Sequence, residues 1–177
     1  MIRATRNLLA SLVTTILVLG AMALDATAQS GVVGWGAQVV NSSWNDEAFV
    51  EVAGGWWHTL ARRGDGTVVA WGFNGHGQCD VPALPPGGSY TQMAGGFNHS
   101  VARRSDGTVV AWGNNYWGQC NVPALPPGLS YVEVAAGEAH TLALRSDGTI
   151  VAWGDNGSGQ CNVPALSAGL SYVEIAA

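Results

Sequence analysis

The chain has 177 residues, a formal net charge of −5 and only 11% charged residues, and all seven of its basic residues are Arg. A hydrophobic share of 47% is enough for a packed core and excludes a disordered chain. The Arg residues form no basic block, which argues against a nucleic-acid-binding surface. The high counts of Gly (25) and Trp (8) predict short strands, tight turns and repetition.

Residues 1–28 have the pattern of a signal peptide. Two Arg precede an uncharged, mostly apolar stretch over 8–24, and an Ala-Thr-Ala cleavage motif ends at Ala28. We expect cleavage between Ala28 and Gln29, which makes the chain a secreted, periplasmic or cell-surface protein. The alternative is an uncleaved anchor, although the apolar stretch is short for a membrane span. Cleavage would remove 28 residues and leave 149.

A repeat of 41 residues fills the rest of the chain. Three full copies occupy 49–89, 90–130 and 131–171, a partial copy occupies 29–48, and 172–177 opens another. Residues of the same type recur at this spacing: Trp71, Trp112 and Trp153; His58, His99 and His140; Cys79, Cys120 and Cys161.

Each copy reads as three short strands. A short loop joins the first two strands, and Asp-Gly joins the second and third because it supplies the positive φ angles of a tight hairpin. The third strand is an apolar run that we expect to be buried on both faces. A second loop and a Pro-containing stretch follow, and Pro fits an outer edge rather than an inner strand. In the third copy the strands fall at 131–135, 140–144 and 150–153, the loops at 137–139 and 154–160, and the turn at 146–149.

Four motifs of the third copy resemble the regulator-of-chromosome-condensation repeat family. They are A-A-G-x-x-H-T-L-A-L over 135–144, S-D-G-T over 146–149, V-A-W-G over 151–154 and N-x-x-G-Q over 156–160. The resemblance implies an all-β fold, a seven-bladed β-propeller. Secreted bacterial members look most similar, among them a β-lactamase-inhibitory propeller protein that binds its target through a propeller face. The eukaryotic founder exchanges nucleotide on a nuclear GTPase, which conflicts with a signal peptide.

The number of copies is smaller than the resemblance implies. Seven blades of 41 residues need 287 residues, whereas 149 hold about 3.6 copies. Residues 172–177 read as a first strand whose second strand is missing from the sequence, which leaves an unpaired edge. We therefore expect three to four blades, either as a truncated fragment of a seven-bladed ring or as a short chain that closes a ring by oligomerising.

Strand direction places both loops of every copy at the same end of the blades. The loops differ among the copies and are rich in aromatic residues, while the residues around them stay constant, which is typical of a binding surface on a rigid frame. Burial between blades and neutral drift are the alternatives. The candidate binding residues are Trp56, Trp57, Phe73, His76, Phe97, Asn98, Tyr116, Trp117 and Asp155.

We interpret the constant residues as structural. A ring of His bound to a metal is the alternative, although equivalent positions in neighbouring blades are too far apart to share one ion. The same separation argues against disulfides, so we interpret the three Cys as small buried apolar residues. The structural set is Trp35, Trp71, Trp112, Trp153, His58, His99 and His140.

The sequence offers no recurring nucleophile, base and acid, no paired carboxylates and no phosphate-binding loop. It therefore predicts an exported, non-enzymatic protein that uses its aromatic loops to bind an extracellular protein. Binding of a glycan or a cell wall is the alternative, and GTPase nucleotide exchange is a further one by family analogy. We expect no cofactor, no metal, no nucleic-acid partner and, after removal of the signal peptide, no membrane span.

Overall fold

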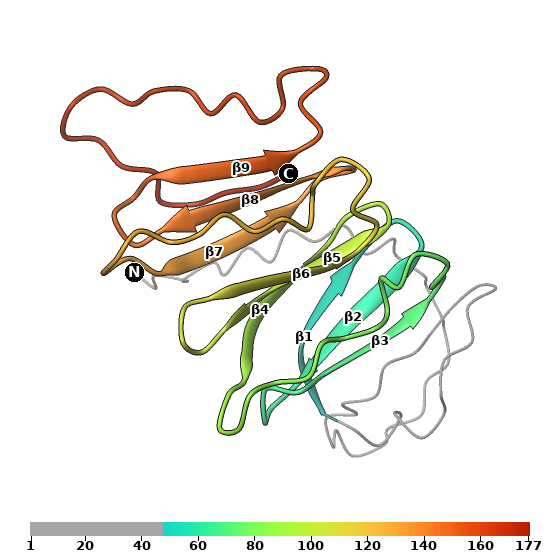
Figure 1. The fold of residues 1–177 in the computed structure, drawn as a ribbon. Coiled ribbons are helices and arrows are strands. Elements are labelled where there is room, and N and C mark those ends of the chain that lie inside the picture. Colours follow the sequence, from blue (N-terminus) through green and yellow to red (C-terminus); the bar gives the residue numbers. More distant parts are fainter. Residues whose placement is uncertain (1–47) are drawn as a thin grey trace, which may run out of the picture.

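The computed structural model describes residues 48–177 of the chain (Figure 1). The predictions for the signal peptide, its cleavage between Ala28 and Gln29, Trp35 and the remainder of 29–47 lie outside the described residues. Residues 48–177 contain no helical segment with the length and hydrophobicity of a membrane span.

Residues 48–177 are all-β and form nine strands in three separate antiparallel sheets (Figure 1). Each sheet holds the three strands of one copy, in chain order, with the second strand in the middle. We name these sheets blades 1, 2 and 3, and their strands confirm the predicted all-β fold. The bounds are β1 (Phe49–Gly54), β2 (His58–Arg63), β3 (Val68–Gly72), β4 (Tyr90–Gly95), β5 (His99–Arg104), β6 (Val109–Gly113), β7 (Tyr131–Ala136), β8 (His140–Arg145) and β9 (Ile150–Gly154).

Asp-Gly hairpins join the second and third strands of each blade, as the sequence predicts. In blade 2 the Asp106 carboxylate accepts hydrogen bonds from the backbone N–H and the hydroxyl of Thr108, at 2.9 and 2.7 Å. Gly107 has a φ of +79°, a conformation that Gly adopts without steric cost. The turn is therefore closed by its own residues, and the other two blades repeat the arrangement.

The hydrophobic core lies between the blades. One cluster joins Leu60 of blade 1 to Met93 and Trp112 of blade 2. The corresponding cluster joins Val101 of blade 2 to Val134 of blade 3. A single three-stranded sheet cannot bury both of its faces, so the stacking of blades supplies the burial that stabilises each one.

A Tyr at the start of blades 2 and 3 ties each blade to the Pro-containing stretch that precedes it. Tyr90 and Tyr131 are almost fully buried, and their hydroxyl groups donate to the carbonyl oxygens of Pro82 and Pro123, both at 2.8 Å. The Pro-containing stretches belong to no sheet, which confirms that they are not inner strands.

The prediction that the third strand is buried on both faces is wrong. In β9 only Trp153 is buried, and the other residues of the strand are half-buried. The reason is position, because β9 lies at the edge of its sheet and β8 occupies the middle.

Residues 172–177 form no strand, but they lie where a further copy is predicted to begin, because they make the backbone contacts that Tyr131 and Val134 make at the start of blade 3. Tyr172 N–H donates to the Gly148 carbonyl oxygen at 3.0 Å, and Ile175 N–H donates to the Glu133 carboxylate at 3.2 Å. The described part of the chain holds no neighbouring strand with which this segment forms a ladder of backbone hydrogen bonds.

Candidate functional site

The two variable loops of every blade lie side by side at one end of the sheets. The first residue of each second loop donates its N–H to the last residue of the first loop: Phe73 to Trp57 at 2.8 Å, and Asn114 to Asn98 at 2.8 Å. Blade 3 has the same contact. This arrangement confirms the predicted placement of both loops at one end. We name this end the top face; its first loops are 55–57, 96–98 and 137–139, and its second loops are 73–78, 114–119 and 155–160.

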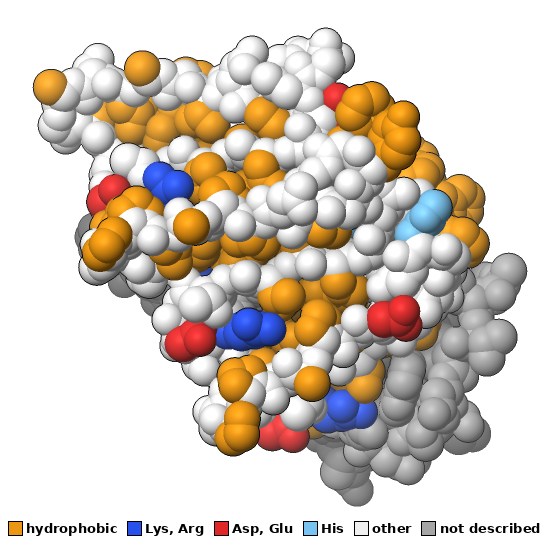
Figure 2. Space-filling view, viewed as in Figure 1, with side chains coloured by type: hydrophobic (Ala, Val, Ile, Leu, Met, Phe, Trp, Pro, Cys, Tyr) orange, Lys and Arg blue, Asp and Glu red, His pale blue; other side chains and the backbone are white. Residues whose placement is uncertain are grey.

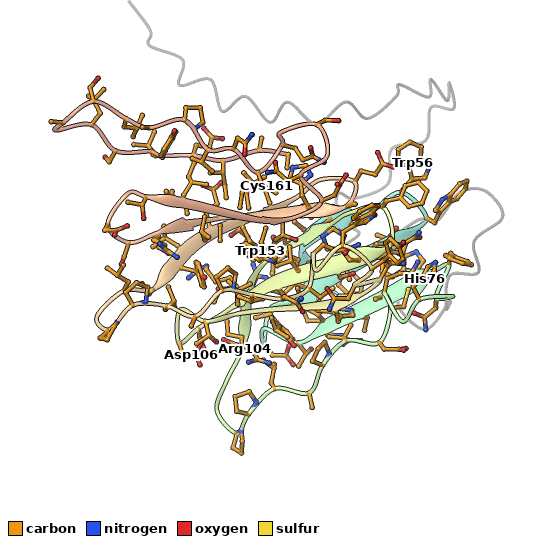
Figure 3. The ribbon with its side chains drawn as sticks, turned by 45° about the horizontal axis from the view of Figure 1, so that its top comes forward. Trp56, His76, Arg104, Asp106, Trp153 and Cys161 are labelled. Carbon is orange, nitrogen blue, oxygen red and sulfur yellow. The ribbon has the colours of Figure 1, made fainter. Side chains whose placement is uncertain are left out.

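The opposite end of the sheets carries the Asp-Gly hairpins, and we name it the turn end. Figure 3 shows the separation, with Trp56 and His76 at one end of the strands and Arg104 and Asp106 at the other.

Polar side chains that recur in every copy hold the second loops in shape. In blade 2 the Asn115 side chain accepts a hydrogen bond from Cys120 N–H and donates one to Asn121, both at 2.8 Å. The Gln119 side-chain oxygen accepts from Trp117 N–H at 3.0 Å. Equivalent bonds occur in the other blades. The variable side chains therefore project from a backbone whose shape is set before any ligand arrives.

The first loops are joined to one another across the blade boundaries. Trp56 N–H donates to the Gly96 carbonyl oxygen at 3.1 Å, and Phe97 N–H donates to that of Glu138 at 3.1 Å. The rings of Trp56 and Phe97 also pack together, with centroids 4.9 Å apart. The top face is therefore one continuous surface over the described blades.

Five of the six predicted aromatic residues are exposed, so burial between blades does not explain them. Tyr116 is 81% exposed and Trp56 is 64% exposed, and Phe97 alone is half-buried. Tyr116 and Trp117 meet edge to face, with ring centroids 4.9 Å apart. The exposed set is Trp56, Trp57, Phe73, Tyr116 and Trp117.

A hollow of about 230 Å³ lies in the top face between blades 2 and 3. It brings together four of the predicted residues, Phe97, Asn98, Tyr116 and Trp117. Sequence reasoning did not select the other lining residues, although they fall in the same variable loops. These are Asn114, Gln119, Glu138 and Ala139.

The 41-residue spacing of the repeat identifies Glu138 as equivalent to two predicted binding residues. Residue 138 stands where the two preceding copies have Trp56 and Phe97, both of which the sequence selected. Trp56 and Phe97 are predicted from their aromatic character, which Glu138 lacks.

The remaining predicted residues lie outside the hollow. Phe73 and His76 form an edge-to-face pair on blade 1, with ring centroids 6.0 Å apart. The Asn114 side-chain amide donates to His76 Nδ1 at 3.3 Å and so links this pair to the hollow. The Asp155 carboxylate accepts from the Gln160 side chain at 2.8 Å, so Asp155 serves the shape of its own loop.

The recurring His residues lie in a hydrogen-bonded chain between blades. Ser100 Oγ donates to the Gln78 carbonyl oxygen at 2.8 Å, so it accepts from His58 Nε2–H, also at 2.8 Å. The Trp112 indole N–H donates to the same carbonyl at 2.9 Å. His99 and Thr141 repeat the contact between blades 2 and 3.

Burial keeps these His residues neutral. Desolvation, together with the nearby His58 and His140, lowers the pKa of His99 from 6.5 to about 4. His99 Nδ1 is buried and has no hydrogen-bond partner among the described residues, so a proton there would be unsatisfied. No group of three or more His, Cys, Asp or Glu in residues 48–177 is placed to hold a metal ion.

The three Cys are free thiols, and they are half-buried where the sequence analysis expected buried apolar residues. Each thiol points to its own second loop, and in blade 2 Cys120 Sγ–H donates to the Asn114 carbonyl oxygen at 3.2 Å. Desolvation raises the pKa of Cys120 to about 11, which disfavours a reactive thiolate. Their hydrogen bonds, rather than full burial, account for their place in the loop.

Several solved structures resemble the described fold. Prp20p from Saccharomyces cerevisiae matches with 30% identity and a TM-score of 0.53, over 61% of this chain and 31% of that chain. A structure of Kap60 bound to yeast RCC1 (Prp20) matches with 25% identity and a TM-score of 0.59, over 73% and 39%. Human WBSCR16 shares the fold at 22% identity and a TM-score of 0.59, over 68% and 38%.

This chain spans about a third of the length of these solved structures. No curated protein sequence matches it significantly. None of the three structures is from a bacterium, so the likeness to secreted bacterial members stays a prediction.

The family model of the regulator of chromosome condensation (RCC1) repeat matches residues 49–78, 90–119 and 131–160, just over half of the chain. Each match covers the three strands of one blade and both of its top-face loops. With three such matches on three successive blades, the chain belongs to the regulator of chromosome condensation repeat family.

Proposed function

We propose that this protein is an exported, non-enzymatic module that binds another protein through its top face. The observation that carries the proposal is a group of exposed aromatic side chains on loops whose backbones are fixed by internal hydrogen bonds. Exposed apolar groups gathered on one surface mark interaction sites, and Trp and Tyr dominate the energetic centres of protein interfaces. The five residues are Trp56, Trp57, Phe73, Tyr116 and Trp117.

The rigid loops support recognition of a protein because little conformational entropy is lost on binding. Trp and Tyr have only two side-chain torsions, and Asn115 and Gln119 already fix the backbone on which two of them stand. The similar yeast protein Prp20p has binding properties toward Gsp1p and histones, which supports a protein partner for this chain.

The proposal is tested by capture on the immobilised full chain from an extracellular protein fraction, followed by titration of each purified binder. Replacing Trp56, Trp57 and Trp117 together by Ala should weaken binding at least about a hundredfold, because interface hot spots each contribute about 2 kcal/mol or more. A control with Leu170→Ala and Val173→Ala removes exposed apolar side chains elsewhere and should leave binding unchanged. Full affinity in the triple Trp variant would contradict the proposal.

Carbohydrate binding is the competing outcome, because exposed Trp and Tyr rings also stack on sugar faces. A glycan array probed with the wild-type chain and the triple Trp variant separates the two. A glycan ligand that depends on these Trp residues, with no protein binder recovered, would overturn protein binding.

Export is tested on its own. Protein recovered from outside the cytoplasm should begin at Gln29 when its N-terminus is sequenced. An uncleaved chain confined to the cytoplasm would contradict export and would make assays of nucleotide exchange on GTPases the next measurement.

A further inference from the structure

Basic residues lie only at the turn end of the described blades. All five occupy the last positions of a second strand, and the chain contains no Lys. In Figure 2 the blue groups lie toward the left and lower side of the view, and none appears along the right-hand edge, where hydrophobic and His groups lie. The top face therefore has no Arg or Lys of its own. The five are Arg62, Arg63, Arg103, Arg104 and Arg145.

Three acidic residues lie in or beside the top-face loops, and two of them are engaged within their own loop. The Asp80 carboxylate accepts from the Asn74 side chain at 2.8 Å, and that of Asp155 accepts from Gln160 at 2.8 Å. The carboxylate of Glu138 is exposed and forms no hydrogen bond or ion pair with any residue in 48–177. Glu138 is therefore the acidic group available to a ligand.

Glu138 lines the same hollow as Phe97, Tyr116 and Trp117. The volume of about 230 Å³ is below the range of roughly 300–1,000 Å³ typical of pockets for drug-sized ligands, so it suits one side chain of a larger partner. Aromatic faces attract cations, and a carboxylate forms strong charge-assisted hydrogen bonds with guanidinium and ammonium groups. Both features favour the same kind of occupant.

We propose that this hollow receives the cationic side chain of an Arg or Lys that projects from the partner protein. The inference rests on the proposed function and specifies the chemistry of one of its central contacts. The aromatic rings of Tyr116 and Trp117 pack against the apolar stem and attract the charge, and Glu138 accepts hydrogen bonds from the head group. A neutral side chain gains neither attraction, and an acidic one is repelled.

The test uses two blocked pentapeptides, Gly-Gly-Arg-Gly-Gly and the same peptide with citrulline, a neutral analogue, in place of Arg. Each is titrated into the full chain while the indole NMR signal of Trp117, assigned with Trp117→Phe, is followed. The Arg peptide should shift this signal saturably and bind about tenfold more tightly than the citrulline peptide. Equal binding of both peptides, or no shift from either at about 10 mM, would overturn the proposal.

Matched variants locate the contact. Glu138→Gln keeps the shape of the side chain and should abolish the preference for Arg over citrulline, whereas Glu174→Gln removes an equal, exposed charge outside the top face and should preserve it. Unchanged thermal unfolding of Glu138→Gln shows that the fold is intact. If the preference for Arg over citrulline survives Glu138→Gln, the proposed role of this carboxylate is wrong. Whether the top face binds protein is decided separately, by the triple Trp variant.

Discussion

The turn end and the top face are built from the same repeat but use it differently. At the turn end Asp-Gly-Thr recurs in all three copies, and its Asp carboxylate bonds to the Thr two residues later. At the top face the loop backbone recurs, yet one position holds Trp56, then Phe97, then Glu138. Constancy among copies therefore marks what a blade needs in order to fold, and variation marks positions that a partner can use.

Two tryptophans of the second copy give the largest contrast in stability. Trp112 is buried between blades and donates its indole N–H to the Gln78 carbonyl oxygen, whereas Trp117 is 55% exposed. Trp112→Ala should lower the free energy of unfolding by about 3–5 kcal/mol, and Trp117→Ala should change it by no more than about 0.5 kcal/mol. Denaturant titration of the full-chain variants measures both. Similar losses of unfolding free energy in the two variants would contradict the division between a structural frame, which contains Trp112, and a binding surface, which contains Trp117.

The hydrogen-bonded His chain should make stability depend on pH. The pKa of His99 is about 4 in the folded chain because of burial and two neighbouring His, against 6.5 in the unfolded chain. The unfolded chain therefore binds the proton more tightly, so the contribution of His99 is complete above about pH 6.5 and is lost as the pH falls toward about 4. The loss should reach about 3 kcal/mol.

Unfolding by denaturant at pH 7, 5.5 and 4.5 checks this dependence. His99→Gln should be less stable at pH 7 and should lose less stability on acidification than the wild type. If both proteins lose the same unfolding free energy on acidification, a group other than His99 is responsible for the pH dependence of stability.

A smaller effect is expected at the Gly that ends β6, beneath the top face. Gly113 has a φ of +104°, and a Cβ there would lie 2.6 Å from the Asn98 carbonyl oxygen and 2.9 Å from His99 Cα. Gly113→Ala should therefore cost about 2 kcal/mol of unfolding free energy. Gly54→Ala is the control, because a Cβ at that position meets no atom of residues 48–177 within 4 Å. Equal thermal unfolding of both variants would disprove the steric role.

Local patterns in the sequence predicted the elements of each blade well. Asp106 and Gly107 specify their hairpin through bonds within three residues, so the turn is readable without knowledge of the fold. Strand direction then placed both variable loops at one end, because each antiparallel hairpin reverses the chain. The burial of β9 was misjudged, since a run of apolar residues does not reveal whether its strand lies in the middle or at the edge of a sheet.

The hollow could not be predicted in full, because it forms between blades. Phe97 and Trp117 belong to blade 2, whereas Glu138 comes from blade 3 and is held beside Phe97 by a backbone hydrogen bond across the boundary. The sequence shows that these residues vary among copies. It does not show which of them meet, or that the Glu138 carboxylate is left without a partner while that of Asp155 is engaged.

Hydrogen–deuterium exchange of the full chain, with and without its purified protein partner, tests the central claim most directly. Binding through the top face predicts slower exchange over 96–98 and 114–119 in the complex, with no change at the hairpin over 105–108. Slower exchange at the hairpins with unchanged exchange in the top-face loops would contradict it.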